Sequence, residues 1–201
     1  MSVCKSTPMV DEDQKRLVAL RRRTAAFLFG RQDVRSKWVN PVDTYGVCFG
    51  LVLDPMVRRR VIGMFDRAAA RVESGWFDDR RGFIYAFHDI GDPSTVIKIG
   101  RTERDPRERV REWNRELSAS EDRAKNLTLL FAYPTRSVVF AEGIVHETLR
   151  CERIANRLNP STAGELDEFF EIANFMALKV FLRNVTKYID RFVANKRFAT
   201  Q

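Results

Sequence analysis

Residues 82–111 read GFIYAFHDIGDPSTVIKIGRTERDPRERVR, and this stretch decides the expected fold. Two short runs rich in Phe, Ile, Val and Tyr, at residues 82–88 and 95–100, lie on either side of a Gly-Asp-Pro turn at residues 91–93. Apolar and β-branched runs separated by such turn residues predict a β-hairpin. We therefore expect two antiparallel strands joined by a short turn.

An arginine-rich helix is expected to follow the hairpin directly. Asp105 supplies a capping oxygen, and Pro106 suits the first helical position. Gly100 permits the sharp turn with which the second strand ends. This order brings Tyr85 and Lys98 close to the helix arginines at positions 107, 109 and 111. A phenol, an amine and guanidinium groups around one turn suit phosphate chemistry.

The remaining segments predict an α+β unit with a small sheet. Residues 126–133 are typical of a third strand, residues 137–158 of a long helix, and residues 172–198 of a final helix into which residues 165–170 lead. Residues 116–125 read as a charged loop. From residue 82 the expected order is β-β-α-β-α-α, with a three-stranded antiparallel sheet.

The segment before the hairpin is expected to be mainly helical. Residues 11–29 and 54–75 keep helical spacing of their apolar residues, and the second of these begins with Asp-Pro and ends at Gly75. Residues 45–53 read as a strand or a buried apolar run. The polar residues 76–81 form the expected boundary with the next unit.

Charge divides the chain into three parts. Residues 1–81 hold 16 basic against 10 acidic side chains, residues 82–171 hold 13 against 16, and residues 172–201 hold 6 against 1. We therefore expect a basic N-terminal region, a slightly acidic central module and a basic C-terminal helix that packs on the module. The net charge of +8 favours polyanionic partners.

Composition excludes several classes of protein. The 201 residues are 44% hydrophobic and include 15 Phe, which predicts a real core. No run approaches the ~18 apolar residues of a membrane span, and residues 1–16 lack the apolar centre of a signal peptide. Three scattered cysteines and two histidines favour neither a disulfide framework nor a structural zinc site. We expect an intracellular protein of the cytoplasm, the nucleus, or a viral factory or virion.

The motifs together resemble the GIY-YIG nuclease superfamily over residues 82–171. The first motif is Phe-Ile-Tyr at residues 83–85 after Gly82, and the second is Lys-Ile-Gly at residues 98–100. The Lys-Ile-Gly form resembles the branch found in phages, large DNA viruses and some fungi. The helix arginine of the family falls on Arg109, and its metal-binding glutamate falls on Glu142. The match rests on the order and spacing of the motifs, since no single motif is specific.

Two further positions complete the resemblance to this branch. His146 follows Glu142 by four residues, and an acidic-aromatic motif, Glu-Phe-Phe, stands at residues 168–170. Residues at i and i+4 share one face of a helix, so His146 is a candidate partner of Glu142 or a proton carrier. We interpret the motif at residues 168–170 as structural closure of the core rather than chemistry.

What the resemblance implies is metal-dependent hydrolysis of phosphodiester bonds. Glu142 would hold one Mg²⁺ or Mn²⁺ because hard cations choose carboxylate oxygens. Tyr85 would orient or deprotonate the attacking water, and Arg109 would stabilise charge on the phosphate. Lys98 stands where the family has a second tyrosine. It supplies positive charge to the phosphate or lowers the pKa of Tyr85, or else the fold binds nucleic acid without cutting it.

Other basic residues are candidates for holding nucleic acid. Arg101 and Arg107 lie close to the motifs and are interpreted as surface or phosphate-steering residues. On the last helix, a basic stripe recurs every four residues opposite an apolar side, and it consists of Lys179, Arg183, Lys187 and Arg191. This stripe either tracks a phosphate backbone or is a solvated face.

Three functions remain open at the level of sequence. The leading hypothesis is a metal-dependent endonuclease that cleaves duplex or branched DNA. The second is a non-catalytic nucleic-acid-binding protein, or a structural protein of virions or chromatin, that retains the fold. The third is an interaction module that docks a partner protein through its basic flanks. A membrane and a small-molecule cofactor are not expected among the partners.

Overall fold

The computed structural model describes residues 41–50, 53–90, 95–120, 127–153 and 168–198. The helix predicted at residues 11–29 lies outside these ranges, as does the end of the helix predicted at residues 137–158. Within the described residues, no helix is long and apolar enough to cross a membrane.

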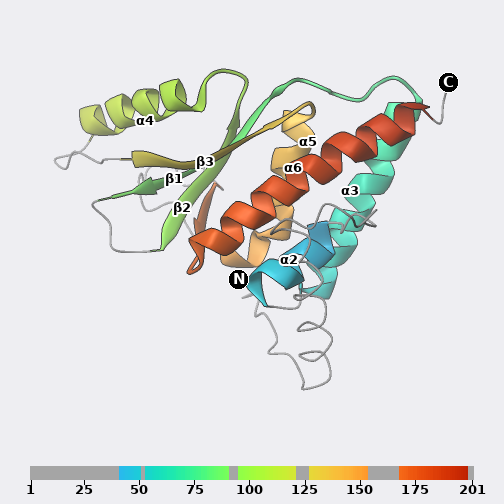
Figure 1. The fold of residues 1–201 in the computed structure, drawn as a ribbon, viewed down its shortest axis with the longest axis horizontal. Helices are drawn as coiled ribbons and strands as arrows, with labels where there is room; N and C mark the ends of the chain where they lie inside the picture. Colours follow the sequence, from blue (N-terminus) through green and yellow to red (C-terminus); the bar gives the residue numbers. More distant parts are fainter. Residues whose placement is uncertain (1–40, 51–52, 91–94, 121–126, 154–167, 199–201) are drawn as a thin grey trace, which may run out of the picture.

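A four-stranded antiparallel sheet forms the centre of the fold (Figure 1). Its strands lie in the order β3-β1-β2-β4, and their bounds are Gly82–Asp89 for β1, Val96–Thr102 for β2, Leu127–Thr135 for β3 and Phe169–Glu171 for β4. The predicted hairpin is confirmed as β1 and β2, whose register pairs Tyr85 with Gly100. The α+β class is confirmed as well.

The prediction of three strands was wrong, because β4 adds a fourth. Residues 169–171 were expected to lead into the last helix, but they pair with β2, and Phe169 lies opposite Lys98. Three residues are too few to show a period of two in the sequence. Their partner strand also lies about 70 residues earlier in the chain, so no local signal marks the pairing.

The described residues form five α-helices around the sheet. Their bounds are Pro41–Phe49 for α2, Pro55–Glu73 for α3, Pro106–Ser120 for α4, Val138–Thr148 for α5 and Phe175–Phe198 for α6. The predicted start of α3 is confirmed, since Asp54 accepts hydrogen bonds from the amides of Met56 and Val57. Its predicted end is confirmed too, because Gly75 has a φ of 76°, which favours glycine.

Three boundaries differ from the sequence expectations. Residues 45–49 belong to helix α2 rather than to a strand. Helix α4 runs to Ser120 and so includes residues 116–120, which were assigned to a loop. Helix α5 ends at Thr148, ten residues early, where a short 3₁₀ turn at Arg150–Glu152 replaces it. Tertiary contacts override weak local propensity in each of these segments.

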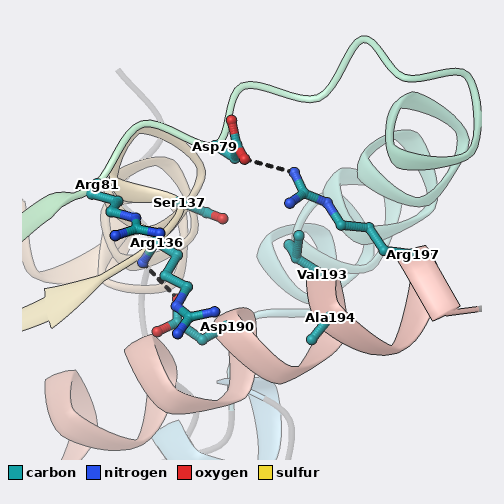
Figure 2. A pocket seen from close by; sticks show the side chains of 8 residues that line it. All are labelled: Asp79, Arg81, Arg136, Ser137, Asp190, Val193, Ala194 and Arg197. Carbon is teal, nitrogen blue, oxygen red and sulfur yellow. Dashed lines mark hydrogen bonds and ion pairs between the residues drawn. The ribbon is translucent and has the colours of Figure 1, made fainter.

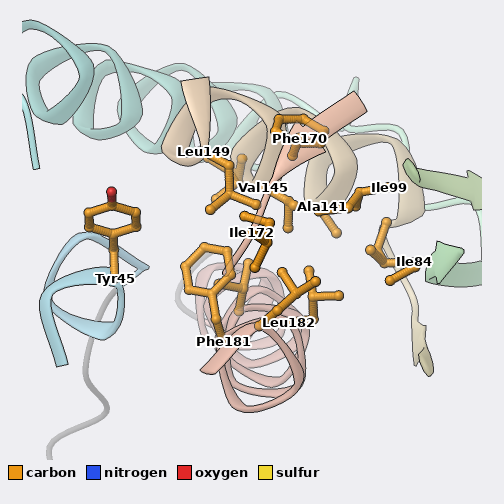
Figure 3. Packing of buried hydrophobic residues seen from close by; sticks show 14 of the residues in the cluster. Tyr45, Ile84, Ile99, Ala141, Val145, Leu149, Phe170, Ile172, Phe181 and Leu182 are labelled. Carbon is orange, nitrogen blue, oxygen red and sulfur yellow. The ribbon is translucent and has the colours of Figure 1, made fainter. Parts of the chain in front are cut away.

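One face of the sheet carries the main hydrophobic core (Figure 3). Ile84 of β1 and Ile99 of β2 pack there against α5 and α6, together with Tyr45 of α2 and Val61 of α3. The apolar side of α6 lies inside this core, whereas all four residues of the basic stripe are exposed. The helices before β1 and the last helix therefore share one core with the central sheet.

The opposite face of the sheet packs against α4 and forms a second, smaller cluster. Tyr85 and Phe87 of β1 lie there against Val110 and Trp113 of α4. Because side chains alternate along a strand, Lys98 and Gly100 of β2 belong to this face, while Ile97 and Ile99 belong to the main core. Tyr85 of the first motif and Lys98 and Gly100 of the second therefore lie on the same face of the sheet, beneath α4.

The fourth strand can be tested by truncating its buried aromatic ring. Phe170 is fully buried in the main core, so we expect Phe170→Ala to lower the free energy of unfolding by about 3–5 kcal/mol. The control is Glu171→Ala, an exposed position on the same strand, which should change it by less than about 0.5 kcal/mol. Urea unfolding measures both, and equal effects would contradict the docking of β4.

Candidate active site

Tyr85 of β1 fits against β2 because position 100 of β2 is a glycine and has no side chain. Its ring is buried and stacks on Phe87, with ring centroids 4.0 Å apart. Its hydroxyl lies over Gly100, where a Cβ atom would come within 2.8 Å of Tyr85 Oη and 3.0 Å of Cζ. Contacts this short do not occur, so only glycine at position 100 leaves room for the phenol. The glycine of the second motif therefore positions the tyrosine of the first.

Burial raises the pKa of Tyr85 to about 12. The neighbouring carboxylate of Glu168 acts in the same direction within this shift, whereas the positive charge of Arg109 acts against it. At neutral pH the phenol therefore keeps its proton. It acts as a hydrogen-bond donor unless more positive charge is brought close.

Lys98 is a completely buried ammonium group. It forms an ion pair with Glu168, and its Nζ lies 4.1 Å from the ring centroid of Trp113 and 5.2 Å from that of Phe169. Burial lowers the pKa of Lys98, and the pairing with Glu168 opposes that shift. A buried charge needs such a partner. Lys98 is thus an interior cation in a carboxylate and aromatic cage.

Glu168 is the residue of this site that sequence reasoning set aside. The segment at residues 168–170 was interpreted as closure of the core, and Phe169 and Phe170 are indeed buried. The glutamate instead pairs with Lys98, and its charge raises the pKa values of both Tyr85 and Glu142. The signal available in the sequence was its place in the acidic-aromatic motif of the resemblance.

Arg109 joins the group from the first turns of α4. Its Nη1 lies 2.9 Å from Glu112 Oε2, and its guanidinium carbon lies 5.2 Å from the ring centroid of Trp113. Its positive charge acts to lower the pKa of Tyr85. The capping of the helix by Asp105, whose Oδ1 accepts from the amide of Arg107 at 2.9 Å, sets this geometry.

Glu142 reaches the group from α5, on the other side of the sheet. Its Oε2 lies 2.7 Å from Arg101 Nε. Burial raises the pKa of Glu142, Arg101 opposes this shift, the nearby charge of Glu168 adds to it, and Lys98 opposes it. The charge of Glu142 also raises the pKa of Tyr85. Two carboxylates and a phenol are therefore electrostatically coupled near the edge of β2.

His146 lies on α5 beneath β2. Its Nε2 lies 2.8 Å from the carbonyl oxygen of Ile99 and its ring centroid 5.3 Å from that of Phe170. A carbonyl only accepts, so Nε2 carries the proton in this bond. Burial lowers the pKa of His146, while the bond to Ile99 and the charge of Glu168 oppose the shift. The neutral ring thus supports the strand that holds Gly100.

The remaining candidate residues lie apart from this group. Arg107 is exposed on α4. The basic stripe of α6 lies beside β3, where Lys179 Nζ is 5.8 Å from the ring centroid of Phe131. Strand β3 is one edge of the sheet, whereas Tyr85 and Lys98 lie on the interior strands β1 and β2 and face α4. The stripe and the Tyr85 group are therefore separate parts of the molecule.

Comparison with known families matches residues 82–192 to the T5orf172 domain. The chain belongs to the T5orf172 domain family. This family is related to the GIY-YIG nucleases, so the resemblance is supported at the level of the superfamily. The T5orf172 match extends through β1–β4 and into α6, and it agrees with a nuclease-like or DNA-binding function. Searches among curated proteins and among solved structures found no match.

The dependence of Tyr85 on Gly100 predicts a specific loss. Gly100→Ala forces the Tyr85 ring to move, and we expect it to lower the free energy of unfolding by about 1–3 kcal/mol. The control is Gly63→Ala on α3, where the new methyl meets only the flexible end of Arg67 at 3.3 Å. That change should be neutral or stabilising by up to ~1 kcal/mol. Urea unfolding compares them, and a stable Gly100→Ala variant would refute the packing described.

The buried imidazole predicts a pH dependence of stability. Because the pKa of His146 is lowered in the folded state, the unfolded chain takes up the proton first as pH falls through about 6.5. Stability supported by the neutral ring is thus fully present above that pH and is lost below it. We expect the unfolding free energy to drop less between pH 7.5 and 5.5 in His146→Gln than in the wild type. Parallel profiles would contradict this assignment.

Proposed function

We propose that this chain is a metal-dependent DNA endonuclease that hydrolyses phosphodiester bonds at the group formed by Tyr85, Lys98, Arg109, Glu142 and Glu168. The observation that carries the proposal is the coupling of Tyr85 to three charged groups from separate elements. The positive charge of Arg109 and the negative charges of Glu142 and Glu168 all act on its pKa. Such convergence of titratable groups is typical of active sites.

The donor set fits one hard divalent cation, Mg²⁺ or Mn²⁺. Burial raises the pKa of Glu142 and the nearby charge of Glu168 adds to that shift, so a bound cation would favour the charged forms of both carboxylates. No cluster of three or more His, Cys, Asp or Glu side chains occurs in the described part of the chain. Mg²⁺ binds through one or two carboxylates and keeps several waters, so Glu142 and Glu168 are the residues that would hold it. When bound, the cation would neutralise phosphoryl charge and acidify a water.

The side chains themselves would bind and orient the phosphodiester. Arg109 presents a planar guanidinium that matches two phosphoryl oxygens, and Glu112 holds it from the far side at 2.9 Å. The protonated phenol of Tyr85 would position the attacking water by a hydrogen bond. A pKa of about 12 keeps its proton in place at rest, so proton transfer depends on positive charge from Arg109 and the cation.

The identity of Lys98 supports the branch of the superfamily with Lys-Ile-Gly as its second motif. A tyrosine at this place would contribute a phenol, whereas Lys98 contributes a buried cation paired with Glu168. The pair holds the second carboxylate close to Tyr85 and Glu142. In this proposal Lys98 is therefore a positioning residue that acts through Glu168, and His146 supports the same strand through Ile99.

A non-catalytic nucleic-acid-binding protein is the second candidate. Two observations favour it, because Glu142 is already paired with Arg101 at 2.7 Å and the phenol of Tyr85 is protonated at neutral pH. Both groups would then be structural. The exposed basic stripe on α6 would carry the binding to phosphate.

A nicking assay on supercoiled DNA with Mg²⁺ or Mn²⁺ tests the leading proposal. We expect Glu142→Gln to lower the rate by at least about 100-fold, because it removes a charged ligand and a coupled carboxylate. The matched control is Glu147→Gln on the same helix. The two glutamates have side-chain exposures of 18% and 19%, and each pairs with arginine.

Three outcomes of this assay are distinguishable. Cleavage that survives Glu142→Gln would refute the proposed site, and equal losses in both variants would point to folding. Binding of DNA without cleavage by the wild type would favour the second candidate. In that case the apparent dissociation constant should rise steeply with salt, and mutation of the stripe should reduce the slope.

A further inference from the structure

A cavity of about 290 Å³ lies between the start of α5, the irregular segment that precedes β1 and the last turns of α6 (Figure 2). The charged residues that line it are Asp79, Arg81, Arg136, Asp190 and Arg197. Three arginines face two aspartates there, so the lining carries net positive charge. A second hollow beside it shares Arg81, Arg136 and Asp190. The cavity is separate from the group around Tyr85.

Ser137 provides an unused donor inside this cavity. The residue is fully buried, and its hydroxyl has no hydrogen-bond partner among the described residues. Ser137 stands at the N-cap of α5 but makes no side-chain capping bond. Figure 2 shows the hydroxyl pointing into the space between Asp79 and Val193. A buried hydroxyl without a partner costs stability, which indicates a place where a ligand completes its bonding.

Two of the arginines form no ion pair with the residues that the structure describes. In the described part of the chain, the side chains of Arg81 and Arg136 form neither a hydrogen bond nor an ion pair, whereas Arg197 pairs with Asp79 at 2.8 Å. The carboxylate of Asp190 is engaged elsewhere, since it accepts from the hydroxyl of Thr135 at 2.6 Å and from the amide of Arg136 at 2.9 Å. The lining therefore keeps a net positive charge, and Arg81 and Arg136 stand outside any ion pair among the described residues.

We infer that this cavity binds a phosphate group. A phosphate oxygen would accept from the hydroxyl of Ser137, and its charge would be compensated by Arg81 and Arg136. The positive end of the α5 dipole adds to the same preference, because α5 is an eleven-residue helix whose N-terminus opens here. A tetrahedral anion presents oxygens in several directions, so it can accept from donors on different sides of the cavity, which a planar carboxylate of a protein partner does less well.

The cavity-lining residues of α6 place this site next to the basic stripe. Cavity-lining residues at positions 190 and 194 follow Lys187 and Arg191 by three residues each, so they lie on the adjoining face of the helix. A nucleic-acid backbone that follows the stripe could place one phosphate in the cavity. A free phosphate monoester is the other source of the same chemistry. Only the first source rests on the proposed function.

The experiment measures binding of inorganic phosphate by NMR titration at constant ionic strength. We expect Ser137→Ala and Arg136→Gln each to weaken binding ~10-fold, because each removes one charge-assisted hydrogen bond. The matched control is Arg59→Gln, which removes an exposed arginine of α3 outside the cavity. Ser137→Ala removes no side-chain hydrogen bond among the described residues, so its urea midpoint should be no lower than that of the wild type.

The outcomes separate the site from the proposed nuclease activity. Phosphate binding that is unchanged in Ser137→Ala and Arg136→Gln, or that falls equally in Arg59→Gln, would overturn the inference. A second titration with a short duplex oligonucleotide identifies the source. Parallel losses for duplex and phosphate assign the site to the nucleic-acid backbone, and unchanged duplex affinity with lost phosphate binding assigns it to a free phosphate or monoester. Cleavage is not read out, so failure of the nuclease proposal leaves this test intact.

Discussion

The ammonium group of Lys98 is a positive charge in an apolar interior, and the surrounding structure is arranged to compensate it. Removing an ion from water costs several kcal/mol unless a counter-charge accompanies it, and Glu168 supplies that charge from about 70 residues away. The ion pair accompanies the pairing of β4 with β2. Strand β4 in turn leads into α6, whose apolar side covers the main core. The ion pair of Lys98 with Glu168 thus connects the β1–β2 hairpin to β4, which precedes the last helix.

The elements that the sequence predicts well are those set by neighbouring residues. The hairpin follows from its turn and its apolar runs, α3 from Asp54 and Gly75, and α6 from its apolar repeat. The elements it misses depend on distant partners. Strand β4 is too short to show a pattern of its own. In α2, Tyr45 packs against Phe181 of α6, with 6.4 Å between the ring centroids. Such contacts leave no local trace in the sequence.

The candidate site divides in the same way. Tyr85 and Arg109 were expected together because a hairpin followed by a short turn and a helix leaves little choice, and the charge of Arg109 does act on the pKa of Tyr85. Strand alternation also separates Arg101 from Lys98, since odd-numbered residues of β2 face α5. That parity explains why Arg101 meets Glu142 of α5 rather than the side chains beneath α4. The role of Glu168 could not be derived locally, because it requires knowing that β4 exists.

The Tyr85 group differs from the α6 stripe and the Ser137 cavity in whether its cations are paired. This difference indicates which step of a nuclease reaction each would support. In the Tyr85 group the cations are compensated, since Lys98 pairs with Glu168, Arg101 with Glu142 and Arg109 with Glu112. In the proposed nuclease such a group would attract phosphate weakly by itself, and a divalent cation held by Glu142 and Glu168 would leave the lysine and arginine charges available to phosphate. The exposed stripe on α6 and the unpaired arginines beside Ser137 need no such exchange. Binding would therefore persist without metal, whereas cleavage would require it.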